Sequence, residues 1–195
     1  TKLKDIDVSV EELTKLVNRG GTSGIGWRGF EKGGFIVDAG HEFGKGKEKE
    51  TFLPSSASES ANPALTILRH QIPEHWRFVL VIPNVKKGAY GDEEVSIFQS
   101  HAPIPREEVN EVSHHILMKL VPGVIRKNLA CFGEGLKRIQ NIGFKKIEIS
   151  LQHNIVKDIL TFFEEYGVKA YGMSSFGPSV VGIVESDKEA NDLLI

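Results

Sequence analysis

The chain has one cysteine, no long apolar run and no excess of charge of either sign. Its single cysteine, Cys131, excludes an intramolecular disulfide framework and a cysteine-rich zinc site. No apolar stretch approaches the roughly 18 to 20 residues that cross a bilayer. The 24 Lys and Arg residues balance 26 Asp and Glu residues, so the net charge of -2 does not favour a nucleic-acid partner. We therefore expect a globular protein of a reducing, cytoplasmic setting, with neither a membrane nor a nucleic acid as its partner.

Residues 1–41 predict a helix followed by a β-hairpin. Ser9 and Glu12 have the spacing of a capping box, and apolar residues then recur on one helical face up to Gly20, which predicts a helix over 10–18. Two glycines, at 33 and 34, indicate a turn, and the apolar stretch Phe35–Val37 that follows them indicates a strand. We expect residues 24–30 to form the first arm of this hairpin.

The composition changes after residue 41. Residues 42–63 combine a charged run with a stretch rich in Ser, Ala and Glu, so we expect 42–75 to be a linker or mobile loop between two domains. Residues 76–195 then predict a buried strand over 77–82, helices, two strands and the start of a last helix. Pro122 is expected to break the first helix. The predicted helices cover about 105–121, 125–140 and 155–166, and the later strands 170–173 and 179–185.

Two glycine-rich turns are candidates for binding an anion. Gly20–Gly26 contains four glycines together with Thr22 and Ser23, so backbone N–H and hydroxyl donors could approach a phosphate closely. This segment lacks the lysine of a Walker A loop. Gly172–Pro178 sets two adjacent serines between glycines, where they could hydrogen-bond a phosphate or a sugar hydroxyl. For both segments the alternative is a turn with a purely structural role.

Asp38 and His41 follow the predicted strand at 35–37. A carboxylate and an imidazole at the end of a strand could orient one another or help to hold a metal. The alternative is an aspartate that caps nearby backbone, and the short spacing does not decide between the two.

The glycine-rich segments resemble motifs of the GHMP kinases. Gly21–Gly26 followed by Gly33–Val37 is similar to the family's G-T-x-S-G-x-D…G-G segment with one residue fewer before the serine, and Gly172–Val181 resembles its C-terminal glycine-rich motif. Over most of the chain the pattern resembles one archaeal branch, the beta-ribofuranosylaminobenzene 5'-phosphate synthases. The matching blocks are Arg19–Gly26, Phe52–Ser58, Glu93–Gln99, Gly143–Lys146 and Gly172–Pro178.

The resemblance implies an α+β fold in two parts. Residues 1–41 correspond to the C-terminal part of the GHMP N-terminal domain, a helix plus a hairpin, and 76–195 to the GHMP C-terminal domain, a ferredoxin-like split βαβ arrangement. The final strand of that arrangement and the family's main phosphate loop are not in the sequence. We therefore expect the complete protein to be longer at both ends, the C-terminal domain to be truncated, and this chain alone to be inactive.

One departure from the family bears on the activity. GHMP kinases place a catalytic aspartate directly after the first motif, and this position is Gly26, which has no side chain to accept a proton from an alcohol. An ATP-dependent kinase would therefore need another base. Such a kinase, or a binding module without catalysis, stays open as an alternative.

The branch resemblance implies a glycosyltransferase of methanopterin biosynthesis. Phosphoribosyl pyrophosphate loses pyrophosphate, the ring carbon that bears the carboxylate of 4-hydroxybenzoate or 4-aminobenzoate bonds to the anomeric carbon, and CO2 leaves. The departing pyrophosphate needs Mg2+ together with backbone or cationic donors. The residues expected at the phosphates are Gly20, Gly21, Thr22, Ser23, Gly24, Gly26, Ser174, Ser175 and Gly177.

Three side chains are the candidates for catalysis. Arg19 is expected to bind the pyrophosphate or the carboxylate, because its planar fork fits both. Asp38 is expected to stabilise the sugar cation or to contact Mg2+, and His41 to transfer a proton at the phenol or amine. The segment 52–58 could close over the substrate and exclude water. The resemblance also implies small-molecule substrates and a homodimer.

Overall fold

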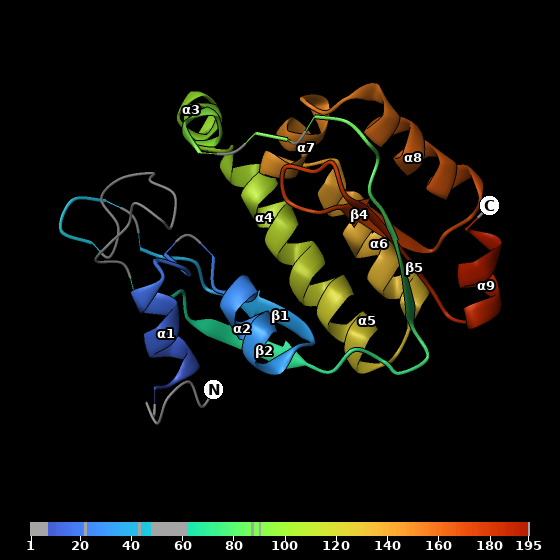
Figure 1. Cartoon of the computed structure of the whole chain (residues 1–195), viewed down its shortest axis with the longest axis horizontal. Helices are drawn as coiled ribbons and strands as arrows, with labels where there is room; N and C mark the ends of the chain where they lie inside the picture. Colours follow the sequence, from blue (N-terminus) through green and yellow to red (C-terminus); the bar gives the residue numbers. More distant parts are fainter. Residues whose placement is uncertain are drawn as a thin grey trace. The chain divides into compact units, whose positions relative to one another are not determined.

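The computed structural model of the chain describes residues 8–21, 23–42, 44–47, 62–86, 88–89 and 91–194, and these form an α+β fold (Figure 1). The chain divides into two compact units. Unit 1 comprises Thr1–Gln71 and Gly91–Gln99, and unit 2 comprises Ile72–Tyr90 and Ser100–Ile195. Among the described residues, none of the helices has the length and apolar character needed to cross a membrane.

The described residues of unit 1 form two helices and a pair of antiparallel strands, together with most of a third helix. The predicted first helix is confirmed, and its capping box is formed: the Ser9 hydroxyl accepts from the Glu12 N–H at 3.1 Å, and the Ser9 N–H donates to the Glu12 carboxylate at 2.9 Å. The elements are α1 (Val10–Leu16), α2 (Ile25–Lys32), β1 (Phe35–Asp38), β2 (Thr66–His70) and α3 (Asp92–His101).

The prediction of a hairpin arm over 24–30 is wrong, because Ile25–Lys32 forms helix α2. Side chains distant in sequence stabilise both ends of this helix. The Asp38 carboxylate accepts hydrogen bonds from the first turn, and the Arg69 guanidinium donates to the Lys32 carbonyl at 2.6 Å. These are the charges that a helix dipole favours at its two ends. Strand β1 pairs with β2 instead, so that residues 66–70, which fall within the predicted linker, form a strand.

Unit 2 contains a three-stranded antiparallel sheet with helices packed against it. The predicted strands at 77–82, 170–173 and 179–185 are confirmed, and the sheet order β3-β5-β4 is the one that a split βαβ arrangement produces. The elements are β3 (Arg77–Val81), α4 (Arg106–His115), the π-helix η2 (Ile116–Leu120), α5 (Val121–Ile125), α6 (Leu129–Gln140), α7 (Gly143–Ser150), α8 (Asn154–Glu165), β4 (Ala170–Met173), β5 (Val180–Val184) and α9 (Asp187–Asp192).

Several helix boundaries differ from those predicted. Pro122 does not break the first long helix: it lies in the first turn of α5, which follows the π-helix η2 directly, and the chain stays helical from α4 through η2 into α5. The helix predicted over 125–140 begins at Leu129, where the Asn128 side chain caps it. Helix α7 was not predicted. Helix α8 begins at Asn154 and is capped by His153, one residue earlier than expected.

The core of unit 2 lies between the sheet and α8. Phe163 of α8 is buried against Gly182 of β5, and α6 packs against β4. Strand β3 lies at the edge of the sheet and only one of its faces is buried: Val79 is in the core, while Phe78 and Leu80 are exposed, contrary to the prediction of a buried strand. The turn at 174–179 joins β4 to β5 at one end of this sheet.

Candidate functional site

The first glycine-rich segment lies in unit 1 and is bound to Asp38. One oxygen of this carboxylate, Oδ2, accepts hydrogen bonds from the Gly24 N–H at 2.7 Å, the Ile25 N–H at 3.2 Å and the Ser23 hydroxyl at 3.1 Å. The other, Oδ1, accepts from the Gly40 N–H at 3.0 Å. Donors expected to bind a phosphate are therefore already bound to an internal anion. The structure shows the alternative in which Asp38 caps nearby backbone.

The remaining positions of this segment differ in exposure. Gly20 and Gly21 are buried, and Thr22 lies outside the described residues. Gly26 is exposed, and a Cβ atom added to it would meet nothing within 4 Å. This position therefore has room for a side chain and lacks one.

The other two catalytic candidates of unit 1 lie apart from the Asp38 hydrogen bonds. The His41 Nε2 atom is 2.8 Å from the Asn62 carbonyl, which can only accept, so Nε2 carries the proton and Nδ1 of the neutral ring is an acceptor. Arg19 is exposed to solvent. In the described part of the chain, no hydrogen bond joins Asp38 to His41.

The second glycine-rich segment lies in unit 2 and forms a tight turn. The Gly177 N–H donates to the Ser174 carbonyl at 2.8 Å, and the Ser174 N–H donates to the Ser179 carbonyl at 2.9 Å. Ser175 and Gly177 both have positive φ, at 46° and 66°. Ser174 and Ser175 are exposed, so the turn presents both hydroxyls to solvent, as a phosphate-binding loop would need.

Side chains from α6, α7 and the segment after α7 hold this turn, mainly through its carbonyl groups. The Lys145 ammonium donates to the Ser175 carbonyl at 2.9 Å and forms an ion pair with Glu148, which is only 8% exposed. The Gln152 amide donates to the Phe176 carbonyl at 2.8 Å, and the Gln140 amide oxygen accepts from the Met173 N–H at 2.8 Å.

Sequence reasoning did not identify these supporting side chains. The matching block Gly143–Lys146 includes Lys145, and Glu148 follows at the i+3 position of the same helix face. That spacing was the signal in the sequence that could have indicated the ion pair of Lys145 and Glu148. The contacts with residues 173–176 come from the fold and have no local signature.

The described residues offer no metal centre of their own. Within them, no group of three or more His, Cys, Asp and Glu side chains could hold a metal ion. Both oxygens of Asp38, the predicted Mg2+ contact, are engaged by N–H and hydroxyl donors.

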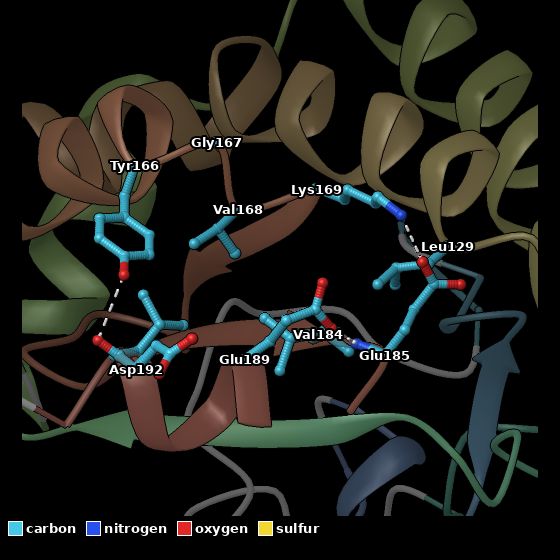
Figure 2. Close-up of a pocket in the computed structure, with 11 residues that line it drawn as sticks. Leu129, Tyr166, Gly167, Val168, Lys169, Val184, Glu185, Glu189 and Asp192 are labelled. Atoms are coloured by element: carbon cyan, nitrogen blue, oxygen red, sulfur yellow. Dashed lines mark hydrogen bonds and ion pairs between the residues drawn. The ribbon is translucent and has the colours of Figure 1, made fainter. Parts of the chain in front are cut away.

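A separate pocket of about 100 Å³ lies at the other end of the unit 2 sheet, away from the turn at 174–179. Figure 2 shows side chains that line this pocket. Leu129, Val168 and Val184 form its apolar wall. Lys169 at its rim is bound to Glu185, and this hydrogen bond raises the pKa of the Lys169 ammonium. The rim also carries Glu189 and Asp192. An anionic substrate would meet three carboxylates and one neutralised lysine there, so this pocket is not the predicted phosphate site.

Comparisons with known proteins agree with the predicted resemblance. Residues 120–194 match the family described as GHMP kinases C terminal. The chain is 44% identical over 99% of its length to the beta-ribofuranosylphenol 5'-phosphate synthase of Methanocaldococcus jannaschii, 45% over 91% to that of Methanothermobacter thermautotrophicus, and 42% over 96% to that of Archaeoglobus fulgidus. It spans 58%, 53% and 56% of these relatives, little more than half of their length.

A solved structure agrees with the fold. Homoserine kinase from Cytophaga hutchinsonii superposes with a TM-score of 0.51 at 13% identity, covering 67% of this chain and 38% of that one. At this identity the likeness concerns the fold alone. The predicted resemblance is thus confirmed: residues 120–194 match the GHMP kinase C-terminal domain, and most of the chain is similar to the three synthases.

Proposed function

We propose that the full-length protein is a decarboxylating pentosyltransferase that joins the phosphoribosyl group of phosphoribosyl pyrophosphate to 4-hydroxybenzoate. The observation that carries this proposal is the identity of 42–45% over at least 91% of the chain to three proteins named beta-ribofuranosylphenol 5'-phosphate synthase. The phenol in that name favours an acceptor with a hydroxyl group over one with an amine. Gly26, where a kinase of the family keeps its aspartate, also favours this chemistry over phosphoryl transfer.

The proposed reaction balances in two steps. The bond between the anomeric carbon and pyrophosphate breaks, and its electron pair leaves with pyrophosphate. The ring carbon that bears the carboxylate bonds to the anomeric carbon while the phenol gives up its proton. The bond to the carboxylate then breaks, CO2 leaves, its electron pair restores the aromatic ring, and the phenol oxygen takes its proton back.

Two side chains of unit 1 have the chemistry that this reaction needs. The exposed guanidinium of Arg19 suits a pyrophosphate or a carboxylate. Nδ1 of His41 is a hydrogen-bond acceptor, since Nε2 donates to the Asn62 carbonyl, and this supports a role for His41 in moving the phenol proton. For Asp38, the four hydrogen bonds to residues 23–25 and 40 favour a role in holding the loop over direct contact with the sugar.

Mg2+ fits this proposal as part of the substrate. Mg2+ usually binds through substrate phosphates and one or two carboxylates, and the described residues contain no cluster that would hold it without them. We therefore propose that the ion arrives on the pyrophosphate oxygens. A homodimer in the cytoplasm is part of the same proposal.

The test uses the protein extended to the length of its relatives. It is incubated with phosphoribosyl pyrophosphate, Mg2+ and 4-hydroxybenzoate labelled at the carboxyl carbon. The expected result is release of labelled CO2 and pyrophosphate in equal amounts, with 4-aminobenzoate a poorer acceptor. Turnover of ATP on an alcohol without release of CO2 would overturn the proposal in favour of a kinase.

A further inference from the structure

We propose that Lys145 is the cation of a phosphate site at the Ser174–Gly177 turn, and that Glu148 neutralises it while the site is empty. This inference rests on the proposed function, because it assigns a phosphate of phosphoribosyl pyrophosphate to the turn. Lys145 would bind the ligand directly, and Glu148 is a positioning residue.

The position of the Lys145 ammonium carries this inference. Its Nζ lies 2.9 Å from the Ser175 carbonyl, in the middle of the turn that exposes the Ser174 and Ser175 hydroxyls. An ammonium has three donors, and the described contacts with Ser175 and Glu148 account for two of them. The third is left for an oxygen of a ligand at the same turn.

The burial of the pair explains why a lysine can be kept in this place. The Lys145 side chain is 20% exposed and the Glu148 side chain 10%. A buried cation without a partner would be strongly unfavourable, and a partner one helical turn away on α7 avoids this cost. When a phosphate approaches, its charge competes with Glu148 for the ammonium, so the strength of this ion pair tunes the affinity for the ligand.

Two other donors among the described residues do not offer this charge. The Gly143 N–H at the start of α7 is already bound to the Glu108 carboxylate at 2.6 Å, and the Gln152 amide is neutral. Lys146, the next residue, is exposed and serves as a matched control of the same charge on the same helix.

The experiment uses the full-length protein. Calorimetry measures its affinity for inorganic pyrophosphate, and steady-state kinetics measure its KM for phosphoribosyl pyrophosphate and for 4-hydroxybenzoate. Lys145→Met alone would leave Glu148 buried without its partner, so the informative variant is the double change Lys145→Met with Glu148→Gln. The expected result is a roughly 10- to 100-fold loss of affinity for pyrophosphate and a similar rise in KM for phosphoribosyl pyrophosphate, with KM for 4-hydroxybenzoate unchanged. Lys145→Arg should restore most of the affinity, and Lys146→Met should change neither value.

Glu148→Gln by itself separates this role from a structural one. It frees the charge of Lys145, so pyrophosphate should bind more tightly, whereas loss of a merely structural ion pair would weaken binding. Weaker binding by Glu148→Gln, or unchanged binding by the double variant in a folded protein, would overturn the inference. Since pyrophosphate binding is measured without turnover, a protein that binds it through Lys145 and yet releases no CO2 would contradict the proposed function alone.

Discussion

The two glycine- and serine-rich segments have similar compositions but opposite electrostatic surroundings. The loop at the start of α2 is bound to a carboxylate, that of Asp38, which accepts from its N–H groups and from Ser23. The turn at Ser174–Gly177 is bound to an ammonium, that of Lys145, which donates to one of its carbonyls. The first segment therefore already holds an anion, and the second already holds a cation.

This difference indicates that a glycine-rich turn binds an anion only when its hydrogen-bond donors have no acceptor within the protein. In unit 1 the donors at 23–25 bind the carboxylate of Asp38. This carboxylate caps the N-terminus of α2 and thereby stabilises the fold. In unit 2 the supporting side chains bind the carbonyls of 175 and 176 and leave the serine hydroxyls exposed. Of the two, the second has the surroundings that suit a phosphate.

The strongest test of this comparison removes the internal anion. Asp38→Ala deletes the acceptor for three donors at the start of α2, so we expect the free energy of unfolding to fall by about 3 kcal/mol. Asp38→Asn keeps an oxygen acceptor and should lose less. Chemical denaturation gives the change, and amide hydrogen exchange over Ile25–Lys32 locates it. Unchanged exchange in α2 would contradict the capping role.

The next largest effect concerns the packing under the second turn. A Cβ atom on Gly88 would lie 1.6 Å from the Phe176 carbonyl oxygen, so Gly88→Ala must displace either the 88–89 segment or the turn. We expect a loss of about 2 kcal/mol in stability, as for other overpacked sites, and weaker pyrophosphate binding. Denaturation and calorimetry on the same variant measure both. Wild-type values for both would show that the turn does not depend on this contact.

The sequence predicted those elements whose signals are local. The Ser9–Glu12 capping box, the apolar run at 77–82 and the strands at 170–173 and 179–185 each have their cause within a few residues, and each is present. Helix α2 was missed because its glycines predict a turn, and the side chains that stabilise its ends, Asp38 and Arg69, lie in two different strands.

The residues of the candidate site show the same dependence on local signals. Glycines beside hydroxyl residues led to the prediction of Ser174 and Ser175, and equally of Thr22 and Ser23, since that signal lies within one short segment. Lys145 and Gln152 contact the turn from 30 and 24 residues away, and Glu108 caps α7 from 35 residues away. Only the packed fold brings such residues together, so nothing in the sequence indicated that they contact the turn or cap α7.

A smaller effect of opposite sign is expected at Gly26. This residue lies in the first turn of α2 with open space around its Cβ position, so Gly26→Ala should raise the stability of the helix by about 0.5–1 kcal/mol. Gly26→Asp returns the carboxylate that GHMP kinases carry and should give no ATP-dependent phosphorylation of an alcohol. A gain of such phosphorylation, detected with labelled ATP, would show that the first segment retains a phosphotransfer site and would undo the contrast between the two segments.

The last test compares the serines of the two segments directly. The Ser23 hydroxyl donates to Asp38 at 3.1 Å, so Ser23→Ala should cost about 0.5–1.5 kcal/mol of stability and leave pyrophosphate binding unchanged. Ser174 is exposed and takes part in its turn through backbone groups, so Ser174→Ala should leave the unfolding midpoint unchanged and weaken pyrophosphate binding. Denaturation measures the stability of both variants, and calorimetry measures their affinity for pyrophosphate. If Ser23→Ala weakened binding while Ser174→Ala did not, the assignment of the two segments would be reversed: the loop bound to Asp38 would have to exchange that carboxylate for a phosphate, and the turn bound to Lys145 would be structural.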